Sequence, residues 1–315
     1  MSGNTNGHIS YASPNNQRQS DERPLLASFP RPSAYGTPHQ TNHNEEDAST
    51  KTKAQHYITT DISLRWADLV LIVCFFVSGV IDAGAYNAYE NFASMQTGNT
   101  IFAALGVSNL PVGAPRLAWT KSVCSILFYL LGSLVTATFH RTFGARKRWV
   151  LATSFSLQAV FILVAAFMVQ RGSSSESPPG DRHPSLSTSI IPSDPGFPWA
   201  DLIPIGLLSF QAAGKVVASR MLEYNALPCV VLTTLYTDLV SDPGFFSAGL
   251  WGNVQRNRRA GGAVAYFVGA VVGGAAAAHE IGFSGALWLA AGVHLGIVGA
   301  WMGWTGDEGE GEGDA

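Results

Sequence analysis

Charged residues are scarce in this sequence. Asp, Glu, Lys and Arg together make up 13% of the 315 residues, whereas 47% are hydrophobic. A soluble domain typically carries about 25% charged residues, so about half of the usual solubilising charge is missing. The deficit is uneven, because residues 1–60 are almost wholly polar and most apolar residues fall between 66 and 304. The composition therefore argues against an ordinary soluble globular protein.

Cysteine is also rare, with three residues in the whole chain. Cys74, Cys124 and Cys229 all lie in apolar runs, and no Cys-x-x-Cys pair is present. This number and spacing exclude a disulfide framework and a cysteine-based metal site. The three residues are best interpreted as small buried hydrophobes.

Patterns typical of enzymes and of nucleic-acid binding are absent as well. The formal net charge is −3, and no basic stripe with interleaved aromatic residues occurs. The sequence has no Walker pattern, no dinucleotide-binding glycine pattern, no Gly-x-Ser-x-Gly elbow and no His-Glu-x-x-His pair. We therefore expect a protein that is not an enzyme, uses no cofactor and binds neither a metal nor nucleic acid. A membrane-embedded enzyme ranks third among the hypotheses, because no paired carboxylates or histidine cluster support it.

Six long apolar segments fill the region from 66 to 304. A bilayer core about 30 Å thick needs roughly 20 mainly apolar residues in a helix, and each segment fits. Aromatic residues such as Trp66, Tyr86, Trp119 and Trp304 stand at their ends, as is typical of the membrane interface. The predicted spans are about 66–86, 117–139, 149–169, 200–219, 261–279 and 283–303. The predicted fold is all-α, a polytopic bundle of membrane helices.

The other residues form two tails and a central loop. The N-terminal residues, rich in Asn, Ser, Pro, Gln, His and Thr, cannot bury enough apolar surface to offset their ordering entropy, so we predict disorder. This terminus lacks a basic-plus-apolar signal peptide, so the first membrane helix is expected to act as an uncleaved signal. The predicted divisions are a tail at 1–60, a membrane domain at 61–304 with halves 61–169 and 199–304 joined by a Ser/Pro-rich loop at 170–198, and an acidic tail at 305–315.

Two shorter apolar stretches, 92–110 and 226–240, either span the membrane or re-enter it. Cytoplasmic loops are enriched in Lys and Arg, and this enrichment distinguishes the alternatives. If both stretches re-enter, the main basic residues share one side of the membrane; if both cross, the two largest clusters lie on opposite sides. These basic residues are Lys51, Lys53, Arg65, Arg141, Arg146, Lys147, Arg148, Arg220, Arg256, Arg258 and Arg259. We therefore predict six spans, two re-entrant stretches and both termini in the cytoplasm.

Under this arrangement, each half consists of a long helix, a short stretch with polar residues at its centre, and then two more long helices. Three spans per half place the second half upside down relative to the first. Such inverted 3+3 repeats are found in many secondary transporters, whose substrate sites lie at the interface between the repeats.

Ionisable and polar residues inside membrane segments are costly and usually have a partner or a function. Asp82, near the end of the first span, is either a proton or cation site or a carboxylate that caps the break before Asn87. Lys215 either extends its long side chain to the interface, which we favour, or pairs with Asp82. Gln211 lies one turn earlier on roughly the same helix face. His294, near the centre of the last span, is best interpreted as a hydrogen-bonded interior residue.

The most distinctive string is Met95-Gln-Thr-Gly-Asn-Thr100. Gly98, flanked by Thr97 and Asn99 at membrane depth, frees backbone groups that can coordinate an ion or small solute. The alternative is a close helix–helix contact. Thr233-Thr-Leu-Tyr-Thr-Asp238 occupies the corresponding place in the second half, which favours a site at the repeat interface.

These strings resemble the YoaK-like membrane proteins, whose shared region is called domain of unknown function 1275. Members of that family tend to show four strings in a fixed order. The matching strings are Ser78-Gly-Val-Ile-Asp-Ala83, Met95-Gln-Thr-Gly-Asn-Thr100, Leu208-Ser-Phe-Gln-Ala-Ala213 and Thr233-Thr-Leu-Tyr-Thr-Asp-Leu239. The resemblance covers about 66–303, with departures at Gln96, at Ala212 in place of Asn and at Thr234 in place of Gly. It implies a multispanning membrane protein and no particular activity.

Two functions compete. The first is a transporter of a small solute or ion in which protonation of Asp82 is coupled to solute movement. The second is a membrane interaction or assembly factor, whose polar strings serve packing alone. The expected partners are the lipid bilayer and a small solute or proton, and a homo-oligomer is compatible with the sequence. The candidate substrate- or ion-binding residues are Asp82, Thr97, Gly98, Asn99, Thr100, Gln211, Lys215, Thr233 and Asp238.

Overall fold

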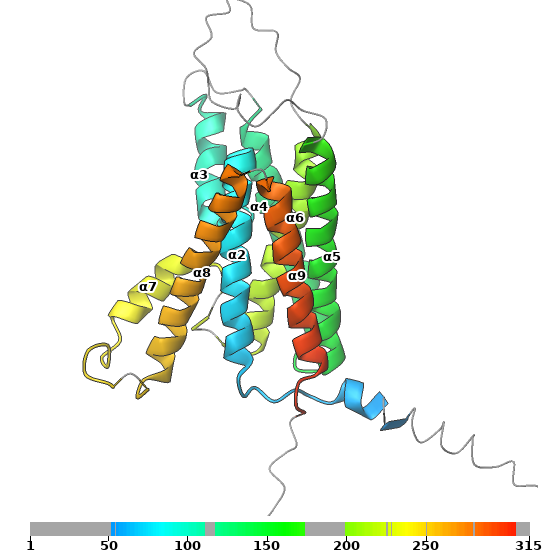
Figure 1. The fold of residues 1–315 in the computed structure, drawn as a ribbon, viewed down its shortest axis with the longest axis vertical. Coiled ribbons are helices and arrows are strands. Elements are labelled where there is room, and N and C mark those ends of the chain that lie inside the picture. Colours follow the sequence, from blue (N-terminus) through cyan, green and yellow to red (C-terminus); the bar gives the residue numbers. More distant parts are fainter. Residues whose placement is uncertain are drawn as a thin grey trace, which may run out of the picture. The chain divides into compact units, whose positions relative to one another are not determined.

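Six long helices and two short ones make up most of the part of the protein that the structure describes (Figure 1). The computed structural model describes residues 52–306 except 54, 111–116, 174–198, 225, 228, 250 and 280. The long helices are α2 (Ala67–Tyr89), α4 (Trp119–Phe143), α5 (Arg148–Ser173), α6 (Leu202–Met221), α8 (Val254–Ala278) and α9 (Gly282–Met302). The short elements are α3 (Gln96–Val107), α7 (Leu232–Val240) and the 3₁₀ turn η1 (Trp199–Asp201).

The predicted helical membrane bundle is confirmed. All six long helices are long and apolar enough to cross a membrane, and no strand is assigned among the described residues. The predictions for residues 1–51, for 174–198 and for 307–315 lie outside the described residues. One boundary differs from expectation: α8 begins at Val254 rather than near 261. The Asn253 side chain accepts a hydrogen bond from the Arg256 backbone N–H at 2.9 Å, which caps a largely polar first turn.

The first short helix, α3, enters and leaves the bundle at the same end. The backbone N–H groups of Ala93 and Ser94, just before α3, donate to Asp82, which lies seven residues before the end of α2. The chain therefore returns by about 10 Å along α2 before α3 begins. At the far end of α3, Gly106 lies against the indole of Trp119, where α4 starts. This is the path through the bundle that the predicted re-entrant stretch requires.

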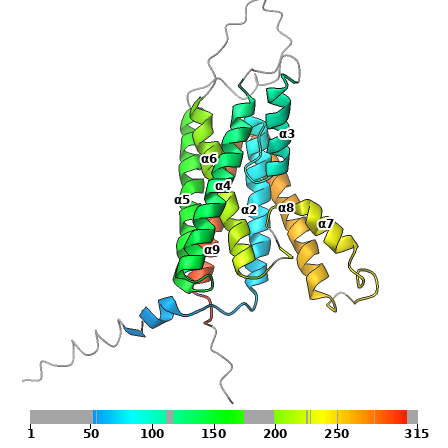
Figure 2. The same cartoon turned by 180° about the vertical axis from the view of Figure 1, so that it is seen from behind.

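The second short helix, α7, also belongs to a segment that enters and leaves the bundle at one end, but this segment reaches less deeply. After α6 the Tyr224 hydroxyl donates to the Leu64 carbonyl at 2.6 Å, at the foot of α2. The chain then runs back into the bundle along α2. Cys229 Sγ lies 3.9 Å from the Leu71 carbonyl, about one turn into α2. From there α7 runs back towards the start of α8, where the Asn253 amide donates to Asp242 at 2.8 Å. Figures 1 and 2 show α7 diverging from the bundle beside α8.

The long helices pair across the two halves of the chain. In each half the helices follow in the same order, α2, α3, α4, α5 and then α6, α7, α8, α9. The first helix of each half packs against the third helix of the other, so α2 lies along α8 and α6 lies along α4, while α5 packs against α9. The foot of α2 meets the C-terminal end of α6, so corresponding helices run in opposite directions. This arrangement is that of the predicted inverted repeat.

Glycines allow both of these cross-half pairs to approach closely. A Cβ atom added at Gly79 of α2 would overlap the Tyr266 carbonyl of α8, and one added at Gly269 would overlap the Phe76 carbonyl of α2. In the corresponding pair, a Cβ at Gly132 of α4 would lie 2.6 Å from the Phe210 carbonyl of α6. Such backbone contact is how small residues stabilise helix pairs in a membrane, where burial of apolar side chains offers little gain.

Both termini of the membrane domain meet at one end of the bundle. The Ile62 N–H donates to the Arg146 carbonyl at 2.9 Å, and the Ser63 N–H donates to the Thr305 carbonyl at 3.1 Å. The buried Arg148 guanidinium donates to the carbonyls of Tyr57 and Trp304. These contacts join the chain before α2, the α4–α5 loop and the chain after α9.

The N-terminal end of α8 lies at this same end of the bundle, because Arg258 of α8 pairs with Asp68 of α2 at 2.8 Å. The basic loops therefore share one end of the bundle, as the re-entrant arrangement predicts. The ordered domain also begins before residue 61, since residues 55–59 are helical and the Tyr57 hydroxyl donates to the Met302 carbonyl at 3.0 Å.

Candidate functional site

Asp82 holds the chain at the start of α3. Its Oδ1 accepts hydrogen bonds from the N–H groups of Ala93 at 2.9 Å and Ser94 at 2.8 Å. Its Oδ2 accepts from the Tyr266 hydroxyl of α8 at 2.8 Å and from the Ser94 hydroxyl. The carboxyl group is buried, and each oxygen has two donors. This geometry matches a capping carboxylate, with its donors at residues 93 and 94 rather than at the break before Asn87.

Asn99 closes the same turn from the other side. Its Oδ1 accepts from the Phe92 N–H at 3.0 Å, and its Nδ2 donates to the Phe92 carbonyl at 2.7 Å and to Ser125 Oγ at 2.8 Å. Gly98 lies under the Phe92 ring, where an added Cβ would be 3.0 Å from two ring carbons. Ser125 Oγ is also 2.8 Å from Ser209 Oγ, which links α4 to α6. The side chains of Asp82 and Asn99 thus hold the turn from both sides.

The threonines of the two strings are turned away from these contacts. Thr97, Thr100 and Thr233 are exposed, and the Thr100 hydroxyl donates to the Gln96 carbonyl of its own helix at 2.8 Å. Asp238 lies on α7, half-buried at the foot of the bundle. The nine candidate residues therefore form separate groups: the α3 turn, the interior of α6, and α7.

A different set of polar residues is buried on three helices of the interior, of which α5 packs against both α6 and α9. These four residues, called the central polar cluster below, are Gln158 of α5, Gln211 and Lys215 of α6, and His294 of α9. Each is at most 3% exposed. The Gln158 amide lies 2.8 Å from where a Cβ on Gly214 would stand, so α5 and α6 are in contact there. The His294 ring stacks on Phe155 with ring centroids 5.5 Å apart, and Lys215 interacts electrostatically with both His294 and Asp82.

The cluster contains polar atoms that no described residue satisfies. They are Lys215 Nζ, both ring nitrogens of His294, Gln158 Oε1 and Gln211 Oε1. The prediction that Lys215 reaches the interface is wrong, because the side chain is fully buried. Among the described residues it also forms no ion pair with Asp82. Burying an unpaired ammonium group is costly, so the cluster is the least satisfied part of the interior.

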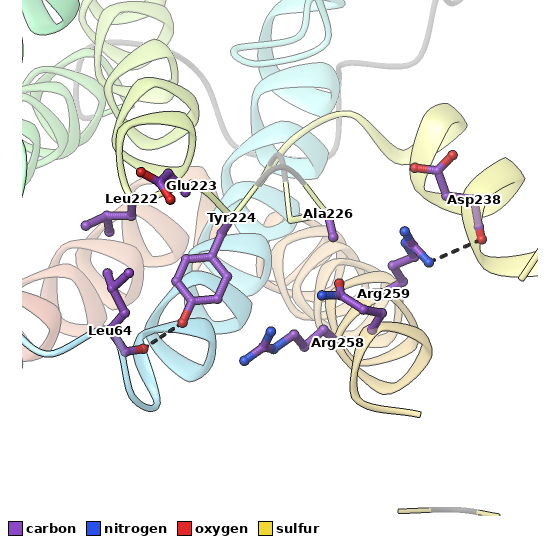
Figure 3. Close-up of a pocket in the computed structure, with 9 residues that line it drawn as sticks. Leu64, Leu222, Glu223, Tyr224, Ala226, Asp238, Arg258 and Arg259 are labelled. Atoms are coloured by element: carbon purple, nitrogen blue, oxygen red, sulfur yellow. Dashed lines mark hydrogen bonds between the residues drawn. The ribbon is translucent and has the colours of Figure 1, made fainter. Parts of the chain in front are cut away.

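A cleft of about 560 Å³ opens at the end of the bundle that carries the basic loops (Figure 3). It lies between the foot of α2, the chain after α6, α7 and α8. Its lining residues are Leu64, Leu222, Glu223, Tyr224, Ala226, Asp238, Gln255, Arg258 and Arg259. Arg259 donates to the Asp238 carbonyl and to Asp242, both at 3.4 Å. Burial raises the pKa of the Tyr224 phenol, and the nearby Arg258 opposes that rise.

The comparisons with known proteins place the chain in a family. A family model described as "Protein of unknown function (DUF1275)" matches residues 70–300. The chain belongs to the DUF1275 family. This confirms the resemblance seen in the sequence. No curated protein and no solved structure matches the chain, and the description of DUF1275 names no activity.

In this DUF1275 protein, the strings that carry the resemblance have a local structural role. Ser78-Gly-Val-Ile-Asp-Ala83 supplies Gly79 for the α2–α8 contact and Asp82 for the α3 turn. Met95-Gln-Thr-Gly-Asn-Thr100 supplies Asn99, which closes that turn. These residues shape the re-entrant segment and the helix contacts around it.

Sequence reasoning missed several residues of the site in this DUF1275 protein. Gln158 was overlooked, although an amide in the middle of an apolar span is itself a signal. Tyr266, Ser125 and Ser209 gave no such signal, because single hydroxyls are common in membrane helices and bond to their own backbone. Only the fold shows that these groups face Asp82 and Asn99.

Proposed function

We propose that this DUF1275 protein is a secondary transporter of a small solute, which binds at the central polar cluster. One observation carries the proposal: five buried polar atoms from α5, α6 and α9 have no partner among the described residues. Polar residues inside a membrane that are not satisfied by the protein mark solute pathways. The cluster also draws on both halves, with Gln158 in the first half and the other three residues in the second.

The paired helices suit an alternating-access mechanism. Transporters built from inverted repeats carry solute by rocking one group of helices against another around a fixed site. The glycine contacts of α2 with α8 and of α4 with α6 provide two close pairs, while α5 packs against α6 and α9 packs against α2 and α8. The two re-entrant segments then serve as gates at opposite ends of the bundle. The cleft beside α7 is the vestibule at the end that carries the basic loops.

Asp82 is better suited to a positioning role in this mechanism than to carrying the proton. Its two oxygens hold four donors, and three of these belong to residues 93 and 94 at the start of α3. Protonation would weaken those bonds and release the α3 gate. The solute itself is expected to contact the unpartnered groups of the cluster.

Solute flux into proteoliposomes tests the proposal. Stopped-flow light scattering would follow vesicle swelling in glycerol, urea, glycine, and the potassium salts of chloride, nitrate, acetate and lactate, with valinomycin to carry potassium. We expect at least one solute to enter faster than into protein-free vesicles, and Gln211→Leu to slow that flux about tenfold or more. Thr142→Val, an exposed change at the end of α4, should leave it unaltered.

Equal swelling in protein-containing and protein-free vesicles for every solute would contradict transport. The interaction-factor hypothesis would then take precedence, because polar groups that serve packing alone predict no flux.

A further inference from the structure

We infer that the central polar cluster binds a small carboxylate that also bears a hydroxyl group. This inference names the substrate class of the proposed transporter and so rests on that function. It follows from the kinds of unpartnered atom that the cluster contains and from the charges around them.

The cluster offers a cationic donor without an acceptor. Lys215 Nζ carries three N–H donors and has no hydrogen-bond partner among the described residues. The charged or titratable groups that interact with it are Asp82 and Cys74 on α2, Cys229 before α7 and His294 on α9. Of these only Asp82 carries a carboxyl group, and its oxygens are already occupied by four donors. A carboxylate on the solute would supply the missing acceptor and charge.

The cluster also offers acceptors without donors. The Oε1 atoms of Gln158 and Gln211 are unpartnered, whereas their amide nitrogens donate to Ser154 at 3.4 Å and to the Leu208 carbonyl at 2.9 Å. A simple carboxylate presents acceptors alone and would leave both amide oxygens unsatisfied. A hydroxyl group donates one hydrogen bond, so it can satisfy one of the two amide oxygens.

An ammonium group could donate to the same oxygens, but the charges disfavour it. A second cation beside Lys215 would be placed in a buried site whose single carboxylate is engaged at the α3 turn. Like charges in low-dielectric surroundings repel strongly. The cluster is therefore better matched to a hydroxy acid than to an amino acid of the same size.

Three molecules with one carbon frame separate these features. Lactate has a carboxylate and a hydroxyl, propionate lacks the hydroxyl, and alanine carries an ammonium group in its place. Binding to the purified full chain in nanodiscs would be measured by calorimetry and by the ligand-induced rise in the unfolding temperature. We expect lactate to bind about tenfold or more tightly than propionate, and alanine to bind more weakly than lactate.

Two variants test which residue contacts the carboxylate of the solute and which contacts its hydroxyl. Lys215→Met should weaken lactate and propionate alike, about tenfold or more, because both lose the cationic donor. Gln211→Leu should weaken lactate towards the affinity of propionate and leave propionate itself unchanged. Lys121→Met is the matched control, because Lys121 pairs with Asp201 at 3.0 Å at the end of the bundle opposite the basic loops. This variant should bind lactate and propionate as tightly as the wild type does.

A folding defect would not imitate this pattern. Replacing an unpaired buried ammonium by methionine should raise the unfolding temperature of the ligand-free protein. Equal affinity for lactate and propionate, or a Lys215→Met variant that binds both as tightly as the wild type, would overturn the inference. If a neutral solute crosses the vesicle membrane but lactate does not bind, the inference about the substrate is wrong and the transport function stands. Lactate binding without any flux would support the site and contradict transport.

Discussion

Asp82 and Lys215 are both ionisable, buried and inside membrane helices, yet their hydrogen bonding differs completely. Asp82 accepts four hydrogen bonds from α3 and α8. Lys215 makes none with the described residues. A satisfied buried carboxylate stabilises the local structure, whereas an unsatisfied ammonium group reduces stability unless another molecule pairs with it. Lys215 is therefore the better candidate for a functional role, and Asp82 the better candidate for a structural one.

A stability comparison tests this assignment for Asp82. Asp82→Ala leaves two backbone N–H groups and two hydroxyls without an acceptor, so we expect a loss of about 3 kcal/mol or more in unfolding free energy. Tyr266→Phe removes one of the four bonds and should cost about 1–2 kcal/mol. Denaturation of both variants in detergent, followed by tryptophan fluorescence, measures the difference. An Asp82→Ala loss no larger than that of Tyr266→Phe would argue against the capping role.

The sequence indicates which residues are unusual but not which atoms they contact. Asp82, Gln211 and Lys215 stand out because polar residues are rare in apolar spans, and all three are buried. The outward direction of Thr97 and Thr233, each on a short helix, differs from expectation, because both strings were predicted to line a site at the repeat interface. The position of such a helix depends on what it packs against.

At the scale of elements, the cross-half pairs depend on close contact between backbones. Gly269 of α8 lies against the Phe76 carbonyl and Gly273 lies against the Val80 carbonyl, both of α2. The sequence shows these glycines as small-residue ridges, which predict tight packing. It does not reveal the partner helix, because α2 and α8 are far apart in the chain.

Two alanine substitutions on one helix test the contact. In Gly269→Ala the added methyl group must push α2 and α8 apart, and we expect a loss of about 1–3 kcal/mol in stability. Gly274→Ala has no atom within 4 Å of the added methyl, and it should be neutral or stabilising by up to about 1 kcal/mol. Thermal unfolding of both variants in the same detergent gives the comparison. Equal effects would mean that α2 and α8 do not touch at Gly269.

At the scale of the whole molecule, topology follows from length and charge. The six long apolar helices were predictable because membrane thickness sets the length of a span, and the shared end of the basic loops followed from the distribution of Lys and Arg. The central polar cluster was not predictable as a unit. Its members come from α5, α6 and α9, and α5 of the first half packs against α6 and α9 of the second.

Cysteine labelling in intact membranes tests the topology. In a chain with Cys74, Cys124 and Cys229 replaced by serine, single cysteines would be placed at Ser108, Arg171, Ala145 and Phe246. We expect the last two positions to react with a membrane-impermeant maleimide from one side, that of the cytoplasm, and the first two from the other. Labelling of positions 145 and 246 from opposite sides would exclude the re-entrant arrangement and remove the inverted repeat.

The pairing of α2 with α8 has a consequence for how the protein is made. α2 ends at Tyr89, and its partner does not begin until Val254. At a synthesis rate of about 5–20 residues per second, the ribosome takes about 10–30 s to produce the intervening chain. During that interval the Gly79 surface of α2 has no native partner, and Asp82 lacks the hydroxyl of Tyr266. The nascent first half must therefore persist in the membrane incomplete, and its survival depends on the quality-control machinery it meets there.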